Sequence, residues 1–102
     1  MEVVWTEQAF ARLMEIEDYI AQDNPAAAQR HTDKLVARSE EITHQPRLGR
    51  VLPELPASGL RELVEGNYRI VYRVGVNRIE ILTVFESHRR LPLNDLPRSG
   101  RS

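Results

Sequence analysis

The chain has 102 residues, of which 41% are hydrophobic, and its formal net charge is −1 at pH 7. A chain of this size fits one compact domain with a single core, and its charge excludes a protein that coats nucleic acid by bulk electrostatic attraction. The absence of cysteine excludes disulfides and thiolate metal sites. Neither a signal peptide nor an apolar run of about 20 residues is visible, so we expect a cytoplasmic protein without a membrane segment.

The start of the chain predicts a short strand followed by a helix. Glu2–Trp5 is a short apolar stretch, and Thr6 after it can accept hydrogen bonds from the amides of a first helical turn. Apolar residues then recur at steps of three and four, which is the spacing of an amphipathic helix that ends near Ala21. The inner stripe of this helix is expected to hold Ala9, Phe10, Leu13, Ile16 and Ile20.

A second helix is predicted immediately after the first. Asn24 is a good helix cap, and Pro25 suits the first helical position. This helix is expected to run to about Thr43, and its inner stripe to hold Ala28, Leu35, Ser39 and Ile42. Small residues at positions 26 to 28 allow the two helices to approach closely, so the pattern predicts a helix hairpin.

Three further strands are predicted after a connector that contains three prolines and two glycines, Pro46 to Gly59. These strands are Leu60–Val64, Tyr68–Val74 and Arg78–Phe85. In the second of them, alternation places Tyr68, Ile70, Tyr72 and Val74 on one face. In the third, the residues expected to share a face are Ile79, Ile81, Thr83 and Phe85. We therefore expect an α+β protein with the order β-α-α-β-β-β, in which a helix hairpin packs on a twisted, mainly antiparallel sheet.

A single domain is expected to cover residues 1–92, with no internal repeat. The remaining segment, residues 93–102, is polar and contains Pro97 and Gly100. Terminal segments of this composition are often not tied to the domain, so we expect a flexible tail.

Arginines recur along the predicted strands and just after them, at Arg61, Arg69, Arg73, Arg78, Arg89 and Arg90. A guanidinium group keeps its charge and presents a planar fork to phosphates or carboxylates. Because antiparallel neighbours place the start of one strand beside the end of the next, Arg69 is expected near His88 and Arg89 at one edge of the sheet. The alternative is that these arginines face solvent and pair with glutamates such as Glu62 and Glu80.

The sequence contains no pattern typical of a metal site, a phosphate-binding loop or a serine nucleophile. The histidines, His31, His44 and His88, have no metal-ligand spacing, and no glycine-rich phosphate loop is present. No serine lies in a nucleophile elbow. We therefore expect neither a metal ion nor a cofactor.

Several short motifs occur in an order that matches a known superfamily: Val4-Trp5-Thr6, Tyr19-Ile20-Ala21, Asn24-Pro25-Ala26-Ala27-Ala28, Pro46-Arg47-Leu48-Gly49-Arg50, Leu60-Arg61-Glu62-Leu63, Tyr68 to Val74 and Ile81 to Arg90. With these motifs the chain resembles the RelE/ParE superfamily of bacterial toxins from type II toxin–antitoxin systems, and most closely its ParE branch. The resemblance covers about residues 3–92. It implies the same helix hairpin on a twisted antiparallel sheet.

One activity implied by the resemblance is that of RelE-like toxins, which cleave messenger RNA on the ribosome. RelE-like enzymes use strand lysines and arginines and a tyrosine near the carboxyl terminus. Here the lysine positions hold Leu60 and Glu62, and residues 91–102 contain no tyrosine. If the chain were such a nuclease, its catalytic residues would be Arg69, His88 and Arg89, with His88 as the base.

The other activity implied is that of ParE-like toxins, which inhibit DNA gyrase without a catalytic site of their own. Under this hypothesis the contacts to gyrase or to an antitoxin are Arg61, Arg69, Arg73, Arg89 and Arg90. A third possibility is a degenerate toxin that retains only antitoxin binding and autoregulation.

The resemblance also implies a cognate, ParD-like antitoxin. Its carboxy-terminal segment would wrap around this chain, and its amino-terminal part would bind operator DNA, so this chain would reach DNA only through the complex. The apolar anchors for the antitoxin would be Val71, Leu82 or Val84 on a less covered sheet face, unless these residues form core under the tail.

Overall fold

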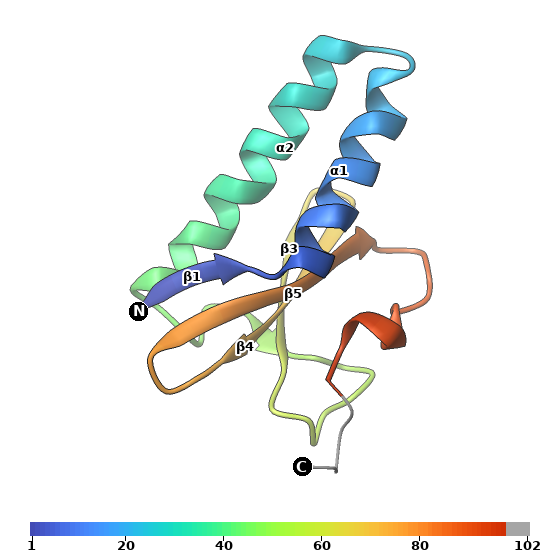
Figure 1. The fold of residues 1–102 in the computed structure, drawn as a ribbon. Coiled ribbons are helices and arrows are strands. Elements are labelled where there is room, and N and C mark those ends of the chain that lie inside the picture. The colour runs from blue at the N-terminus through green and yellow to red at the C-terminus, as the bar shows by residue number, and fades with distance from the viewer. Residues whose placement is uncertain (98–102) are drawn as a thin grey trace.

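A helix hairpin lies across one face of a five-stranded sheet in the computed structural model, which describes residues 1–97 (Figure 1). The first strand, β1 (Glu2–Trp5), leads into the helices α1 (Glu7–Ala21) and α2 (Pro25–Glu40). A 3₁₀ turn, Glu41–Thr43, ends the hairpin. The strands that follow are β2 (Arg50–Val51), β3 (Arg61–Glu65), β4 (Tyr68–Val74) and β5 (Arg78–Glu86).

The strands lie in the order β1-β5-β4-β3-β2. β1 is parallel to β5, and all other neighbours are antiparallel. A parallel pair needs a long crossover, and the helix hairpin between β1 and the later strands supplies it. The predicted α+β fold is therefore confirmed, with β2 as one short additional strand at the edge.

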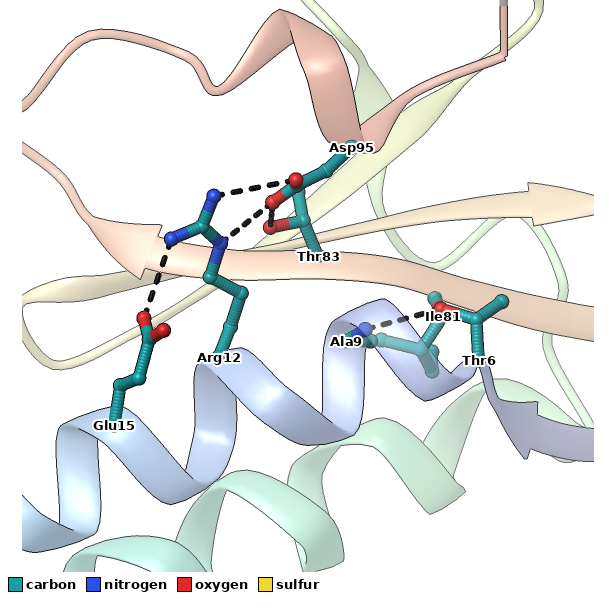
Figure 2. Close-up of polar contacts among 7 residues, drawn as sticks. All are labelled: Thr6, Ala9, Arg12, Glu15, Ile81, Thr83 and Asp95. Atoms are coloured by element: carbon teal, nitrogen blue, oxygen red, sulfur yellow. Dashed lines mark hydrogen bonds and ion pairs between the residues drawn. The ribbon is translucent and has the colours of Figure 1, made fainter.

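Two side-chain caps begin the helices at the predicted positions. The Thr6 hydroxyl accepts a hydrogen bond from the Ala9 amide at 3.1 Å, and it donates to the Ile81 carbonyl at 3.0 Å (Figure 2). The Asn24 side chain accepts from the Ala27 amide at 3.1 Å. Caps of this kind satisfy amides that have no partner within the helix. Thr6 also attaches the start of α1 to β5.

The main core lies between the helix hairpin and the sheet. Its buried members are Ala9, Leu13, Leu35, Ile42, Leu63, Tyr68, Ile70, Tyr72, Ile79, Ile81 and Val84. The predicted inner stripe of α2 is confirmed, since Ala28, Leu35, Ser39 and Ile42 are all buried. In α1 the assignment of Phe10 to the inner stripe is wrong, because its side chain is 54% exposed. Ala9 and Leu13 are four residues apart on the inner face, and Phe10 is rotated about 100° away from Ala9.

A second apolar cluster covers the opposite face of the sheet. It consists of Leu52, Leu60, Val71, Leu82, Phe85 and Leu96. The connector before β3 and the segment after β5 supply the residues that cover this face. Of the two alternatives for Val71, Leu82 and Val84, exposed anchors or core residues, the second is confirmed: all three are buried, Val71 and Leu82 in this cluster and Val84 in the main core.

A β-bulge in β5 explains why the predicted faces of that strand are wrong beyond Ile81. Tyr72 pairs with Ile81, but the preceding residue Val71 pairs with Thr83, so Leu82 is an extra residue in the ladder. One extra residue reverses which side chains point to which face. Val84 therefore faces the helices instead of Phe85.

The residues that directly follow the predicted domain boundary at residue 92 pack on the domain. Leu93–Asp95 forms a 3₁₀ turn, and Leu96 is buried in the second cluster. The Asp95 carboxylate binds Arg12 of α1 and Thr83 of β5 (Figure 2). The remainder of the expected flexible tail, residues 98–102, lies outside the described residues. No helix within residues 1–97 is long and apolar enough to cross a membrane.

Candidate functional site

The arginines predicted as partner contacts do not form one cluster. Arg61 belongs to β3, while Arg69 and Arg73 belong to β4. Arg89 and Arg90 are exposed and follow the end of β5. Each group has different neighbours.

Arg69 is buried rather than exposed, with only 8% of its surface accessible. Its Nη1 and Nη2 atoms bind both carboxylate oxygens of Glu54 at 2.7 and 2.6 Å, and its Nε binds Glu62 at 2.5 Å. The guanidinium carbon lies 4.9 Å from the centre of the Phe85 ring. The hydrogen bond to Glu54, followed by those to Glu62, raises the pKa of Arg69 above its usual value. All three guanidinium nitrogens are therefore engaged by carboxylates, which leaves little capacity to bind a phosphate.

Glu62 is the centre of this network. Its side chain is fully buried and accepts hydrogen bonds from Arg69 and from Arg50, whose Nε lies 2.6 Å away. A buried carboxylate without such partners would be strongly destabilising. The position at which the resemblance places a nuclease lysine thus holds a buried negative charge that joins β2, β3 and β4. We refer to Arg50, Glu54, Glu62 and Arg69 as the carboxylate network.

Arg61 and Tyr72 hold the loop that precedes β2. The Tyr72 hydroxyl accepts from the Gly49 amide at 2.9 Å and donates to the Pro46 carbonyl at 2.7 Å. Arg61 donates to the Gly49 carbonyl at 2.7 Å. Burial raises the pKa of Tyr72, so its hydroxyl keeps the proton that it donates. Arg61 thus has a structural contact of its own.

Arg73 forms an ion pair on the sheet surface, as the alternative interpretation of the arginines expects. Its Nη2 lies 2.5 Å from the Glu80 carboxylate, which Arg78 also contacts at 3.2 Å. Arg73 is the main cause of the lowered pKa of Glu80. Surface pairs of this kind contribute about 0.2–1 kcal/mol to stability.

His88 and Arg89 do not join Arg69 in one site. The Arg89 Nε lies 2.8 Å from the Glu86 carboxylate, and the His88 Nε2 lies 4.0 Å from it. The guanidinium of Arg69 is directed to Glu54 and Glu62 instead. The start of β4 lies beside the end of β5, as expected, but Arg69 makes its hydrogen bonds with Glu54 and Glu62, while His88 and Arg89 lie beside Glu86.

A groove of about 350 Å³ lies where α1 meets the start of β4 and the end of β5. We call it the α1–β5 groove. It is lined by Arg12, Glu15, Ile16, Tyr19, Tyr68, Val84, Phe85, Glu86, Arg89, Arg90 and Pro92. The groove is thus the place where two of the predicted contact residues, Arg89 and Arg90, meet the helix hairpin.

Both apolar and charged groups line the α1–β5 groove. Ile16 and Val84 supply aliphatic surface, and Tyr19 supplies an aromatic side chain on a residue that is 69% exposed. Arginines outnumber glutamates along its walls. A groove of this composition suits a segment that carries both apolar and acidic side chains. Burial raises the pKa of Tyr68 at its base, so that phenol stays neutral.

Arg12 and Tyr19 were not among the predicted site residues. Both belong to α1, in a part of the chain where acidic residues outnumber basic ones. An exposed aromatic residue on a helix face that also carries an arginine is the signal that could have indicated them.

The carboxylate network contributes to the free energy of unfolding in a pH-dependent way, and a Glu54→Gln variant can measure this contribution. The hydrogen bond from Arg69 is the main cause of the lowered pKa of Glu54, whose usual value is 4.5. Because the folded pKa lies below the unfolded one, this contribution is complete above pH 4.5 and is lost as the pH falls through the folded value. We expect the stability difference between the wild type and Glu54→Gln to be constant near pH 7 and to shrink in acid, in urea titrations at each pH. A difference that grows in acid would contradict this assignment.

Within residues 1–97 no group of three or more histidine, cysteine, aspartate or glutamate side chains is arranged to hold a metal ion. The candidate site consists of the α1–β5 groove and the arginines that line it.

Comparison with known proteins gives one consistent result. The family described as the ParE toxin of the type II toxin–antitoxin system parDE matches residues 3–91. Toxin RelE2 of Caulobacter vibrioides is 38% identical over 84 residues, which cover 81% of this chain and 91% of that protein. A solved structure titled as the chromosomal ParDE TA system from P. aeruginosa matches with a TM-score of 0.72 at 27% identity, and covers 84% of this chain and 95% of that one. The chain belongs to the ParE toxin family of type II toxin–antitoxin systems.

Proposed function

We propose that this toxin acts by binding DNA gyrase and that it has no nuclease activity of its own. The carboxylate network supports the lack of nuclease activity, and membership of the ParE toxin family supports gyrase as the target. Cleavage of RNA needs a free cation to stabilise the crowded phosphate and a positioned acid and base. The guanidinium of Arg69 is bound by Glu54 and Glu62, and His88 lies with Arg89 beside Glu86. Loss of such groups costs about 10²–10⁴-fold each in general acid–base catalysis.

We further propose that a ParD-like antitoxin neutralises the toxin by placing a segment in the α1–β5 groove. The structural match to a ParDE system supports an antitoxin partner, and the composition of the groove supports a segment with apolar and acidic side chains. The antitoxin would also bring operator binding, because the net charge of this chain is −1.

Purified toxin with gyrase and supercoiled DNA tests the target directly. The expected result is an accumulation of gyrase-dependent cleaved DNA, while primer extension on translated messages in the same extract shows no new ends. Cuts in translated messages without any effect on gyrase would establish the RelE-like alternative. If neither gyrase-dependent DNA cleavage nor message cleavage is seen, the protein is a degenerate toxin that retains only antitoxin binding.

The groove assignment predicts the effect of reversing the charges that follow β5. The change Arg89→Glu combined with Arg90→Glu should weaken binding of the antitoxin encoded beside the toxin gene by at least about tenfold. Both side chains are exposed, so the free energy of unfolding should change by less than about 1 kcal/mol. Calorimetric titration measures the first quantity and urea unfolding the second. The matched control is Arg47→Glu together with Arg30→Glu, which reverses two exposed charges that do not line the groove. Equal weakening by both pairs would place the antitoxin elsewhere.

A further inference from the structure

We propose that residues 91–96 form a closing strap, and that its clasp, Asp95 with Arg12 and Thr83, holds in place the wall of the α1–β5 groove to which Arg12 and Pro92 belong, and so sets the affinity of the groove for its partner. The strap and the groove wall are features of the free toxin. Their effect on antitoxin affinity rests on the function proposed above.

The clasp is a buried, charge-assisted contact. The Asp95 side chain is 4% exposed and accepts hydrogen bonds from Arg12 Nε at 2.7 Å and Arg12 Nη2 at 3.2 Å. The Thr83 hydroxyl donates to the same carboxylate at 2.8 Å (Figure 2). A carboxylate at this depth is tolerated only while such partners remain in place. These three hydrogen bonds therefore decide whether the strap is closed.

The rest of the strap is held by few interactions. Its backbone hydrogen bonds are local, from the Asp95 amide to Pro92 at 2.9 Å and from the Leu96 amide to Leu93 at 3.1 Å. Leu96 is buried in the second cluster and Leu91 packs against it, but the Leu93 side chain is exposed. A short segment with two apolar anchors and one polar anchor can open without global unfolding.

The strap covers a part of β5 that β1 does not reach. Among residues 1–97, β1 pairs with β5 only from Arg78 to Ile81. Thr83 lies beyond that pairing and is the β5 residue that binds Asp95. The strap thus closes over β5 at the point where the edge of the sheet would otherwise be open.

The groove is lined by Pro92 of the strap and by Arg12 of the clasp, so the position of the strap affects the shape of the groove. Arg12 binds Asp95 and also lines the groove, where Arg90 and Pro92 form the neighbouring wall. When the clasp opens, the segment that forms this wall moves away from the groove, and the Arg12 side chain loses its fixed orientation. A partner that binds only the closed form then has its apparent dissociation constant raised in inverse proportion to the closed fraction.

The variant Asp95→Asn tests the structural part in the free toxin. The amide keeps the size of the side chain and an acceptor for Thr83, but it lacks the charge that binds Arg12. We expect hydrogen exchange of the strap amides to become at least about tenfold faster. The methyl resonances of Ile16 and Val84, which line the groove, should shift with it. The control Glu41→Gln removes the exposed ion pair with Arg38 of α2. It should change neither the exchange rates of the strap amides nor the methyl resonances.

Binding of the antitoxin encoded beside the toxin gene tests the consequence. We expect the dissociation constant to rise at least about fivefold in Asp95→Asn and to stay constant in Glu41→Gln. In the wild type, bound antitoxin should slow exchange of the strap amides. Faster strap exchange without any change in the groove methyls or in affinity would overturn the proposal, and so would unchanged strap exchange. A wild-type toxin that binds no antitoxin would refute the proposed neutralisation by an antitoxin, while the methyl and exchange data would still decide whether the strap holds the groove wall in place.

Discussion

Replacing Arg69 with methionine is expected to lower the free energy of unfolding by about 3 kcal/mol, because the buried Glu62 carboxylate would lose one of its two cations. Glu54 is less affected, since its side chain is 39% exposed and can be hydrated. Urea unfolding followed by circular dichroism measures the change. A loss of less than about 0.5 kcal/mol, typical of a surface substitution, would show that Arg69 is not a structural residue.

The matched control for this prediction removes both buried charges together. Replacing a buried ion pair with apolar side chains of similar volume is often neutral or stabilising. The combined variant Arg69→Met and Glu62→Leu should therefore recover most of the lost stability. Arg50 can remain hydrated in this variant, because its side chain is 66% exposed.

The substitution Gly49→Ala is expected to cost about 3 kcal/mol, because no space exists for a methyl group at this position. A Cβ atom there would lie 2.4 Å from the Glu62 carbonyl oxygen and 2.8 Å from Tyr72 Cε1. The first of these contacts is with backbone, and Tyr72 is itself fixed by its hydrogen bonds to Gly49 and Pro46. The loop would have to move away from β3 to relieve the clash. Thermal and urea unfolding of the variant measure the cost.

Gly59→Ala separates this steric effect from a backbone effect. A Cβ atom at Gly59 would meet nothing within 4 Å, but the residue has a positive φ of 81°. Its replacement should therefore cost only the strain of the left-handed conformation, about 1–2 kcal/mol. If Gly49→Ala is tolerated better than Gly59→Ala, the loop before β2 is not packed as tightly as the structure indicates.

The local order of the elements could be predicted from the sequence because each element carries its own signal. Thr6 and Asn24 cap the two helices where expected. The alternation in Tyr68–Val74 predicted both the bounds and the faces of β4. These features depend on residues that are neighbours in the chain, which is the range over which sequence patterns are informative.

The predictions from the sequence were wrong where residues that are distant in the chain come into contact. Nothing near Leu82 indicates a bulge, which becomes visible only when β5 is paired with β4. One partner of Arg69, Glu62, lies in the neighbouring strand β3, but the other, Glu54, lies in the proline-rich connector. Arg69 was expected at the surface because the alternation of β4 does not show what covers its second face.

The segment after β5 illustrates the same limit. Its polar composition suggested a tail, but Leu91 and Leu96 pack against the second cluster. Asp95 finds its cation on α1, which is 83 residues away in the chain. A tertiary contact of this separation leaves no trace in local composition. The leucines at positions 91 and 96 were the available signal that the segment packs against the domain.

The most direct test of a structural role for Arg69 is growth arrest by the combined variant Arg69→Met and Glu62→Leu, expressed to the same soluble level as the wild type. If the carboxylate network only holds the sheet and its connector together, the variant should regain stability and arrest growth as strongly as the wild type. A variant that is as stable as the wild type but does not arrest growth would show that Arg69 or Glu62 contacts the target, and would contradict the account.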